Sequence, residues 1–205
     1  MVPKKGEYVV FDVETTGLSV TGGDRIIEIG AIRVNNGEIV DKYESFVNPE
    51  RNIPQEAQAI NNISDDMVKD APKADVVLPE FLAFIGGASV VGHNVKFDLG
   101  FVAYQLAQIG RKFRSDTPAI DTLKMAKHLV PHLTRHTLSH VAQYLGIKVD
   151  ETHRALADVE LTVKVLLKLL QMAEDQRIDS FKTLQDAYGV VKPSYKIEST
   201  QATLF

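Results

Sequence analysis

The chain has 205 residues, of which 44% are hydrophobic and 24% charged, with a formal net charge of −4 and no cysteine. This composition is typical of one globular domain with a modest extension, and it excludes disulfides and thiolate metal sites. No stretch has the pattern of a targeting segment or the ~20 apolar residues of a membrane-spanning helix, so we expect a cytoplasmic protein without a membrane partner. The acidic charge disfavours a sequence-specific duplex binder, but not a nuclease whose acids bind metal ions.

The first part of the chain predicts three consecutive strands. Tyr8–Val13 is rich in β-branched and aromatic residues, and Arg25–Val34 and Ile39–Val47 follow it. Asn35-Asn36-Gly37 is a turn signal between the second and third strands, which predicts a hairpin. We therefore expect the sheet to open with antiparallel strands.

Helices dominate after Pro49, and two short buried strands at Ala88–Val91 and Ala119–Asp121 interrupt them. The predicted helices are a short one after Ser64, then Ala74–Ile85, Phe97–Ile109, Thr137–Leu145, residues 154–172 and Phe181–Tyr188. This alternation indicates an α/β fold with a mixed sheet. We expect one main domain over residues 1–175 and an extension over residues 176–205, with an irregular tail from Gly189.

Two acids lie at the end of the first predicted strand. Alternate residues of a strand share a face, so Asp12 and Glu14 project side by side just before the turn Thr15-Thr16-Gly17. Two carboxylates at this spacing repel each other, and a bound cation would remove the repulsion. A solvated strand face is the alternative explanation when this segment is considered alone.

Two further segments carry acids near helix starts. Asp98 lies in the first turn of a predicted helix, where the helix dipole alone also favours a carboxylate. His93 and Asn94, just before this helix, are either site residues or loop residues that satisfy backbone groups. His153 and Asp158 open the last long helix, about 140° apart on an ideal helix, so they converge only if His153 lies on the preceding loop.

Four carboxylates and one imidazole thus occur at strand ends and helix starts, where α/β folds place their sites. A donor set made of oxygen atoms suits hard cations such as Mg²⁺ or Mn²⁺ better than zinc.

The segments FDVETTG, HNVKFD and HRALAD, in this order, resemble the three signature motifs of the DEDDh (DnaQ-like) 3′–5′ exonucleases. The resemblance covers about Tyr8–Ala173, and it is closest to the proofreading epsilon subunit and the exonuclease domain of bacterial DNA polymerase III. It implies a ribonuclease H-like mixed β-sheet flanked by α-helices. It also implies two Mg²⁺ or Mn²⁺ ions bound by Asp12, Glu14 and Asp158, with Asp98 completing the shell of the second ion.

The same resemblance implies a reaction and a substrate. The enzyme would hydrolyse the terminal phosphodiester at single-stranded or frayed DNA 3′ ends, with His153 as general base, in replication proofreading or repair. The candidates for substrate binding are Thr15, Thr16, Gly17, Leu18, His93 and Asn94, with Leu18 against the last base. Phe97 and Ile60 are weaker pocket candidates that we expect in the core.

Two other functions stay open on the sequence alone. An exoribonuclease of the same superfamily would share the metal site and differ in its contacts to the 2′-hydroxyl. A catalytically silent nucleic-acid-binding module would keep the fold, although this chain has all five catalytic residues of the family.

The last five residues, Gln201-Ala202-Thr203-Leu204-Phe205, resemble the bacterial clamp-binding pentapeptide, with Gln201 leading and Leu204 and Phe205 closing it. An extended peptide of this kind can place two apolar side chains in a pocket of its partner. We therefore expect a sliding clamp and a replicative polymerase as partners. The alternative is a hydrophobic latch that folds back onto the domain.

Overall fold

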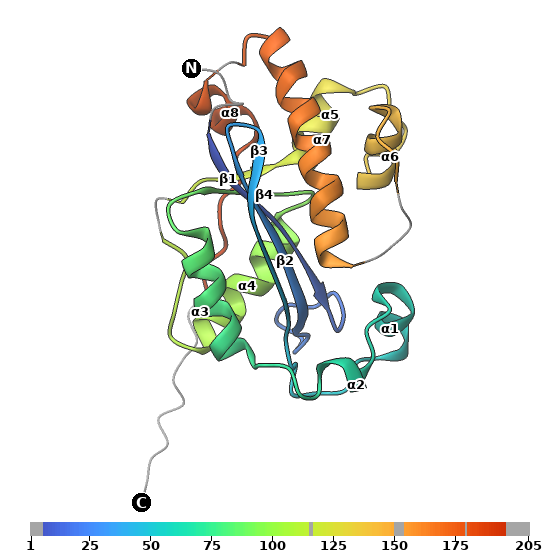
Figure 1. Cartoon of the computed structure of the whole chain (residues 1–205), viewed down its shortest axis with the longest axis vertical. Coiled ribbons are helices and arrows are strands. Elements are labelled where there is room, and N and C mark those ends of the chain that lie inside the picture. The colour runs from blue at the N-terminus through green and yellow to red at the C-terminus, as the bar shows by residue number, and fades with distance from the viewer. Residues whose placement is uncertain (1–5, 115–116, 150–153, 179, 196–205) are drawn as a thin grey trace, which may run out of the picture.

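A computed structural model describes residues 6–114, 117–149, 154–178 and 180–195 of the chain. Its centre is a five-stranded sheet with the strand order β3-β2-β1-β4-β5 (Figure 1). The strands are β1 (Glu7–Thr15), β2 (Ile26–Asn35), β3 (Glu38–Phe46), β4 (Ser89–Gly92) and β5 (Ala119–Asp121). β2 runs antiparallel to both β1 and β3, whereas β4 runs parallel to β1 and β5 runs parallel to β4. The predicted mixed sheet with an antiparallel opening is confirmed.

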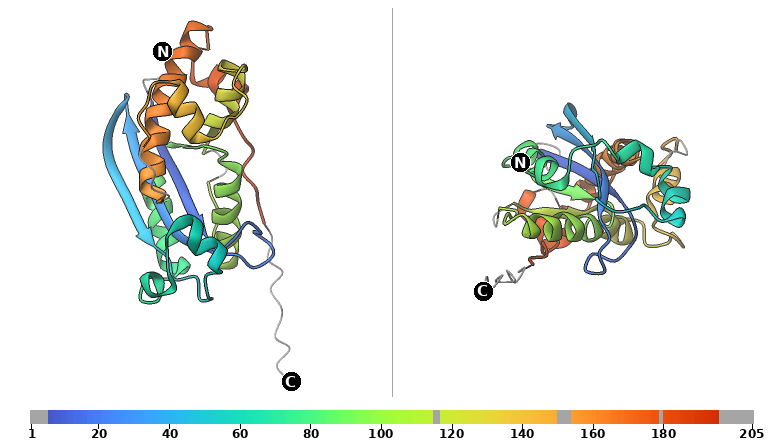
Figure 2. Two further views of the ribbon diagram at one scale, coloured as in Figure 1. Left: turned by 90° about the vertical axis from the view of Figure 1, so that its right-hand side faces the viewer. Right: turned by 90° about the horizontal axis from the view of Figure 1, so that it is seen from below.

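Helices cover both faces of this sheet (Figure 2). They are α1 (Gln55–Asn61), α2 (Asp65–Val68), α3 (Ala74–Ile85), α4 (Lys96–Gln108), α5 (Thr122–Leu129), α6 (Leu138–Tyr144), α7 (Ala155–Asp175) and α8 (Phe181–Tyr188). One core lies between the sheet and α5, α6, α7 and α8, and a second core lies between the opposite face and α3 and α4. This is the α/β architecture predicted from the sequence.

The alternation of side chains along β1 explains the two cores. Val9, Phe11 and Val13 belong to the core under α3 and α4, whereas Val10 belongs to the core under α7. Asp12 continues the α7 face, because successive strand residues point to opposite sides. Asp12 and Glu14 therefore lie on the face of β1 that α7 covers.

The structure differs from the sequence-based predictions in the packing of the C-terminal segment and in the set of helices. The segment from Gly189 to Tyr195 is irregular, but it packs on the domain: Val190 donates a backbone hydrogen bond to Ala119 across 2.9 Å, and the Tyr195 ring contacts the Tyr104 ring of α4 edge-on. The helices α1 and α5 are present in addition to those predicted. In the part of the chain that the structure describes, every helix is too short or too polar to span a bilayer.

Candidate active site

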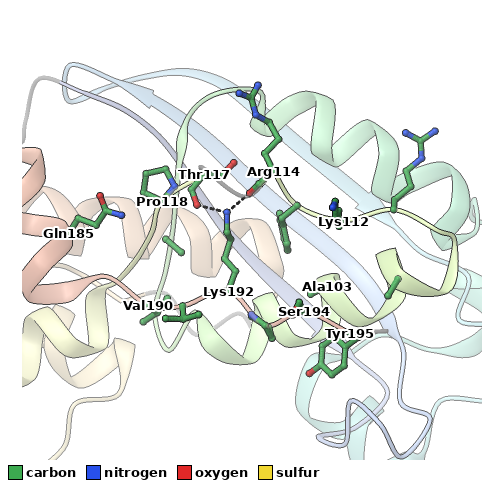
Figure 3. Close-up of a pocket in the computed structure, with 16 residues that line it drawn as sticks. Ala103, Lys112, Arg114, Thr117, Pro118, Gln185, Val190, Lys192, Ser194 and Tyr195 are labelled. Carbon is green, nitrogen blue, oxygen red and sulfur yellow. Dashed lines mark hydrogen bonds between the residues drawn. The ribbon is translucent and has the colours of Figure 1, made fainter. Parts of the chain in front are cut away.

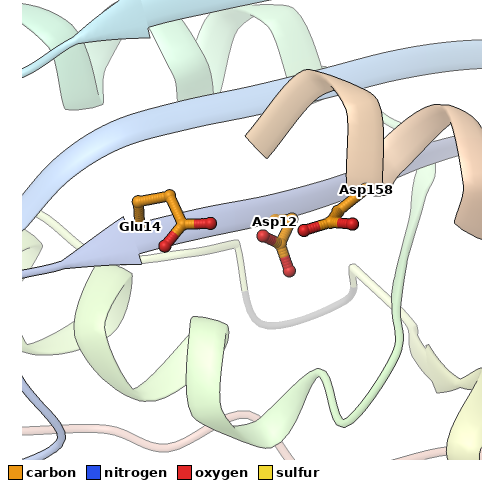
Figure 4. A group of neighbouring side chains, drawn as sticks. All are labelled: Asp12, Glu14 and Asp158. Carbon is orange, nitrogen blue, oxygen red and sulfur yellow. The ribbon is translucent and has the colours of Figure 1, made fainter. Parts of the chain in front are cut away.

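Three carboxylates from two elements meet at the C-terminal end of β1. Asp12 and Glu14 project from the strand, and Asp158 reaches them from the first turn of α7 (Figure 4). One carboxylate oxygen from each of the three lies within 4.8 Å of the others. All three side chains are partly exposed, so a solute can reach them. The structure thus brings together acids that lie more than a hundred residues apart in the sequence.

Asp98 lies beside this cluster on α4 and is almost fully buried, with 2% of its surface exposed. Its Oδ1 accepts a hydrogen bond from the backbone N–H of Val13, with 3.1 Å between the two atoms. Asp98 is therefore attached to β1 between Asp12 and Glu14. In the described part of the chain, Asp12, Glu14 and Asp158 form the group of acids whose oxygens all lie within 4.8 Å of one another. Asp98 lies beside this group and is not one of its members.

Burial, with the charges of neighbouring acids, raises the pKa values of three of these carboxyl groups. Burial, together with the charges of Asp98, Glu14, Asp158 and Glu28, raises the pKa of Asp12 well above its ordinary range. Burial is also the main cause that raises the pKa of Glu14 to about 7, with Asp158 and Glu28 adding to it. Burial raises the pKa of Asp98 to about 7 as well, although the hydrogen bond from Val13 opposes the shift.

This arrangement fits a divalent cation. Carboxylates held this close repel when ionised, and a cation between them would remove the repulsion and stabilise their charged forms. The donor atoms are carboxylate oxygens, the ligands preferred by Mg²⁺ and Mn²⁺. Asp12, Glu14 and Asp158 are therefore the residues that could hold a metal ion.

The turn after β1 is held by its own hydrogen bonds. The Thr16 hydroxyl donates to Asp24 Oδ1 across 3.0 Å, and the Ser19 backbone N–H donates to Asp24 Oδ2 across 2.9 Å. A Cβ on Gly17 would lie 2.5 Å from the Asp24 carboxylate, so glycine allows this approach. Leu18 extends from the turn with 84% of its surface exposed. The predicted substrate-binding turn is thus a rigid loop with an apolar tip.

His93 and Asn94 are held by other hydrogen bonds of the fold. The His93 ring nitrogens contact the Thr122 hydroxyl and the His136 carbonyl, and burial lowers the pKa of its imidazole. Asn94 has a left-handed backbone with a φ of 66°, and its N–H donates to Asp121. These contacts favour the alternative in which both residues stabilise the loop.

The two weaker pocket candidates differ from each other. Phe97 packs on the core beside Phe101, with 5.0 Å between the ring centroids, as expected. The prediction that Ile60 lies in the core is wrong, because 65% of its surface is exposed. Its neighbour Asn61 is buried instead and donates to the Thr15 carbonyl at the end of β1.

Sequence reasoning missed an ion pair beside the cluster. Glu28 of β2 is completely buried, and both of its carboxylate oxygens accept hydrogen bonds from Arg154. A charged residue inside the apolar run RIIEIGAIRV was the signal that could have identified Glu28. His153 lies outside the described residues, as do the tail residues Gln201, Leu204 and Phe205.

A cavity of about 880 Å³ lies elsewhere, between the end of α4, the segment after it and the chain around Lys192 (Figure 3). The Lys192 ammonium donates to the carbonyl oxygens of Arg114 and Thr117. None of the carboxylates described above lines this cavity. It is therefore separate from the candidate active site.

The fold and the carboxylate cluster define a nuclease of the DEDD class, and residues 9–166 match the family described as "Exonuclease" (RNase_T), to which this chain belongs. Two relatives are the "DNA polymerase III PolC-type" proteins of Clostridium perfringens, 41% identical over 183 residues, and Staphylococcus saprophyticus, 38% identical over 200 residues. These matches cover 89% and 94% of this chain, but the chain spans only 12% and 14% of the two polymerases.

Solved structures support the same assignment. Exonuclease X in complex with 5′ overhanging duplex DNA is 25% identical, with a TM-score of 0.70 over 88% of this chain and 98% of that chain. E. coli Exonuclease I in complex with a dT13 oligonucleotide has a TM-score of 0.72 over 85% of this chain and 43% of that chain, and at 18% identity it supports the fold alone. The chain thus belongs to the exonuclease family and has the predicted ribonuclease H-like fold.

Proposed function

We propose that the chain is a 3′–5′ exodeoxyribonuclease that hydrolyses the terminal phosphodiester of DNA and releases nucleoside 5′-monophosphates. The convergence of Asp12, Glu14 and Asp158 within 4.8 Å carries this proposal. A family match alone would also fit a protein that keeps the fold without the chemistry, whereas the converging acids supply the carboxylates that this chemistry needs. The catalytically silent alternative is therefore the weaker one.

The metal site in this proposal takes two divalent ions, Mg²⁺ or Mn²⁺, held by Asp12, Glu14 and Asp158 with Asp98 beside them. Such ions, when bound, activate the attacking water and stabilise negative charge on the phosphate and on the leaving 3′-oxygen. The contribution of the protein is to hold the carboxylates in fixed positions. The attachment of Asp98 to Val13 and of α7 to β2 supports that rigidity.

His153 is the proposed general base, which takes the proton of the attacking water. It directly precedes Arg154 in the sequence, and Arg154 forms the ion pair with Glu28. Neutral imidazole can accept a proton near neutral pH, so activity should rise as His153 loses its charge.

The turn Thr15-Thr16-Gly17-Leu18 is the proposed site for the terminal nucleotide. Its hydrogen bonds to Asp24 hold the backbone in one conformation, and the exposed Leu18 side chain can pack against the last base. In this proposal, His93 and Asn94 contribute to substrate binding indirectly, because they stabilise the loop between β4 and α4. A frayed or single-stranded end suits this arrangement, because the last base must be unpaired to meet Leu18.

The preference for DNA rests on the relatives. The polymerase matches and the DNA complex of Exonuclease X favour DNA, while a 3′-exonuclease that recognises a histone mRNA stem-loop shares the fold at 20% identity. Replication proofreading or repair is the proposed role, with a polymerase and a sliding clamp as partners. The pentapeptide Gln201–Phe205 is the proposed clamp contact.

Digestion of matched DNA and RNA oligonucleotides tests this proposal. Each strand carries a 5′ label, and the reactions contain Mg²⁺, Mn²⁺ or EDTA. We expect the DNA to shorten one nucleotide at a time from its 3′ end with either metal and to stay intact with EDTA. Faster digestion of the RNA would support the exoribonuclease alternative, and intact strands under every condition would support a binding module.

A further inference from the structure

The N-terminus of α7 is fixed to β2 by one buried carboxylate. The Arg154 Nε atom lies 3.0 Å and 3.2 Å from the two oxygens of Glu28, and the Arg154 terminal nitrogen lies 2.5 Å from Glu28 Oε1. The backbone N–H of Ala155, the first residue of α7, donates to Glu28 Oε2 across 3.0 Å. Glu28 thus binds both the residue before the helix and the first N–H of the helix.

The position of Glu28 in the sheet places this contact beside the acids of β1. Glu28 pairs with Glu14 across the β1–β2 ladder, and Gly30 pairs with Asp12. The backbone of α7 also presses on the sheet at Gly30, where a Cβ would lie 2.5 Å from the Leu156 nitrogen. The acids of β1 and the anchor of α7 are therefore neighbours on one face.

Asp158 lies one helical turn from this anchor. It lies in the first turn of α7, and its backbone N–H donates to the carbonyl of Arg154 across 3.0 Å. An arginine–carboxylate pair joined by two hydrogen bonds restricts the relative orientation of the two side chains more than a single contact does. A shift of the first turn of α7 would separate Asp158 from Asp12 and Glu14.

We propose that Glu28 and Arg154 are positioning residues of the metal site, which fix the first turn of α7 so that Asp158 meets Asp12 and Glu14. This inference rests on the proposed function, because it assumes that these three acids bind a divalent cation. Residues that orient metal ligands typically change metal affinity or activity by about 10–100-fold when they are replaced. Glu28 and Arg154 should fall in this range.

The direction of the change in affinity for a divalent cation distinguishes a positioning role of Arg154 from a purely electrostatic one. Arg154→Gln removes a positive charge next to the acidic cluster, so electrostatics alone predicts tighter binding of a divalent cation. Positioning predicts weaker binding, because the anchor is lost. Glu44→Gln is the matched control, since Glu44 lies 3.8 Å from the Arg154 terminal nitrogen, is 45% exposed and makes no hydrogen bond to α7 in the described part of the chain.

The experiment is a calorimetric titration of Mn²⁺ into the full chain, with hydrolysis of thymidine 5′-monophosphate p-nitrophenyl ester measured in parallel. We expect Arg154→Gln to weaken Mn²⁺ binding by about 10–100-fold, and saturating Mn²⁺ to restore much of its kcat. The double variant Glu28→Gln with Arg154→Gln leaves no unpaired buried charge, so it is the second test if the single variant does not fold. We expect weaker binding there too, and wild-type affinity for Glu44→Gln.

Two outcomes have different meanings. If wild type binds Mn²⁺ and hydrolyses the ester, but the Arg154 and double variants bind Mn²⁺ as tightly as wild type or more tightly, the positioning role is wrong. If wild type itself neither binds Mn²⁺ nor hydrolyses the ester, the proposed function fails instead.

Discussion

The Asp98 carboxylate of α4 accepts a hydrogen bond from the backbone N–H of Val13, the residue that separates Asp12 from Glu14. This contact gives Asp98 a structural role in addition to its charge near the cluster. The N–H of Val13 is buried, and it would lose its partner with any side chain that lacks an acceptor. The two roles of Asp98 can therefore be separated by two substitutions.

Asp98→Asn and Asp98→Ala should have different effects on stability. The asparagine side chain keeps an oxygen for Val13, and it removes one charge from a repelling group, so the free energy of unfolding should be unchanged or increased. Alanine leaves the N–H unsatisfied, and should lower that free energy by about 1–3 kcal/mol. Both variants should lower kcat by at least tenfold, because the charge is gone. Urea unfolding and ester hydrolysis measure the two effects, and equal stability of the two variants would contradict the structural role.

The metal-free protein should become less stable as the pH rises. Glu14 and Asp98 have ordinary pKa values of 4.5 and 3.8, and both are raised to about 7 in the folded chain. Between these limits the folded chain holds more protons than the unfolded chain, so the free energy of unfolding falls with increasing pH. In EDTA, the melting temperature should therefore be higher near pH 5.5 than near pH 8.

Addition of Mn²⁺ should reverse this trend. The cation binds ionised carboxylates, so it should raise the melting temperature more near pH 8 than near pH 5.5. Glu14→Gln should weaken the pH dependence in EDTA, because its amide does not titrate. A wild-type protein in EDTA whose melting temperature rises steadily from about pH 5.5 to 8 would disagree with the raised pKa values of these carboxylates.

Much of the fold follows from local patterns in the sequence. The alternation of Phe11 with Asp12 predicts the face of β1 that carries the acids, and Asn36 with Gly37 predicts the turn, where both residues have a positive φ. The helix α5 was missed because Asp121 both ends β5 and caps the next helix, accepting a hydrogen bond from the Leu123 N–H. With no loop between the two elements, there is no boundary signal to read.

The site was less predictable where it depends on contacts between distant segments. The acids could be selected by residue type, but the pairing of Glu28 with Arg154 joins residues 126 positions apart. Ile60 is exposed although it was expected in the core, and its polar neighbour Asn61 is buried and donates to the Thr15 carbonyl. Tertiary contacts of this kind leave no periodic pattern in one sequence.

Gly30→Ala should destabilise the protein and impair catalysis. A Cβ at this position would lie 2.5 Å from the Leu156 nitrogen and 2.6 Å from the Ala155 carbonyl carbon, and backbone atoms cannot rotate away. We expect a loss of about 1–3 kcal/mol in the free energy of unfolding, the usual cost of overpacking, and a lower kcat because Asp158 moves with α7. Gly87→Ala is the matched control, since a Cβ there meets nothing within 4 Å. Equal stability of the two variants would mean that α7 does not press on β2 at Gly30.

Removal of Gln201–Phe205 tests the proposed clamp contact. A docking peptide that is not part of the folded domain should be dispensable for stability, so the melting temperature should stay constant while binding to a bacterial sliding clamp is lost. The full chain should bind with about micromolar affinity, because ordering a short peptide offsets much of its contact energy. A melting temperature that falls by several degrees, together with no clamp binding by the full chain, would support the latch instead.

Mn²⁺ calorimetry, combined with turnover measurements on Asp12→Ala and Asp158→Ala, shows whether the acidic cluster binds the metal ions that catalysis needs. We predict that wild type binds Mn²⁺, that both variants fold but lose most of this binding, and that each keeps less than about a hundredth of the wild-type kcat, equivalent to ~2.7 kcal/mol or more. Asp186→Ala, which removes an exposed carboxylate from α8, should match wild type in both measurements. Wild-type Mn²⁺ affinity in Asp158→Ala, or more than a hundredth of the wild-type kcat in either variant, would mean that this cluster is not the catalytic metal site.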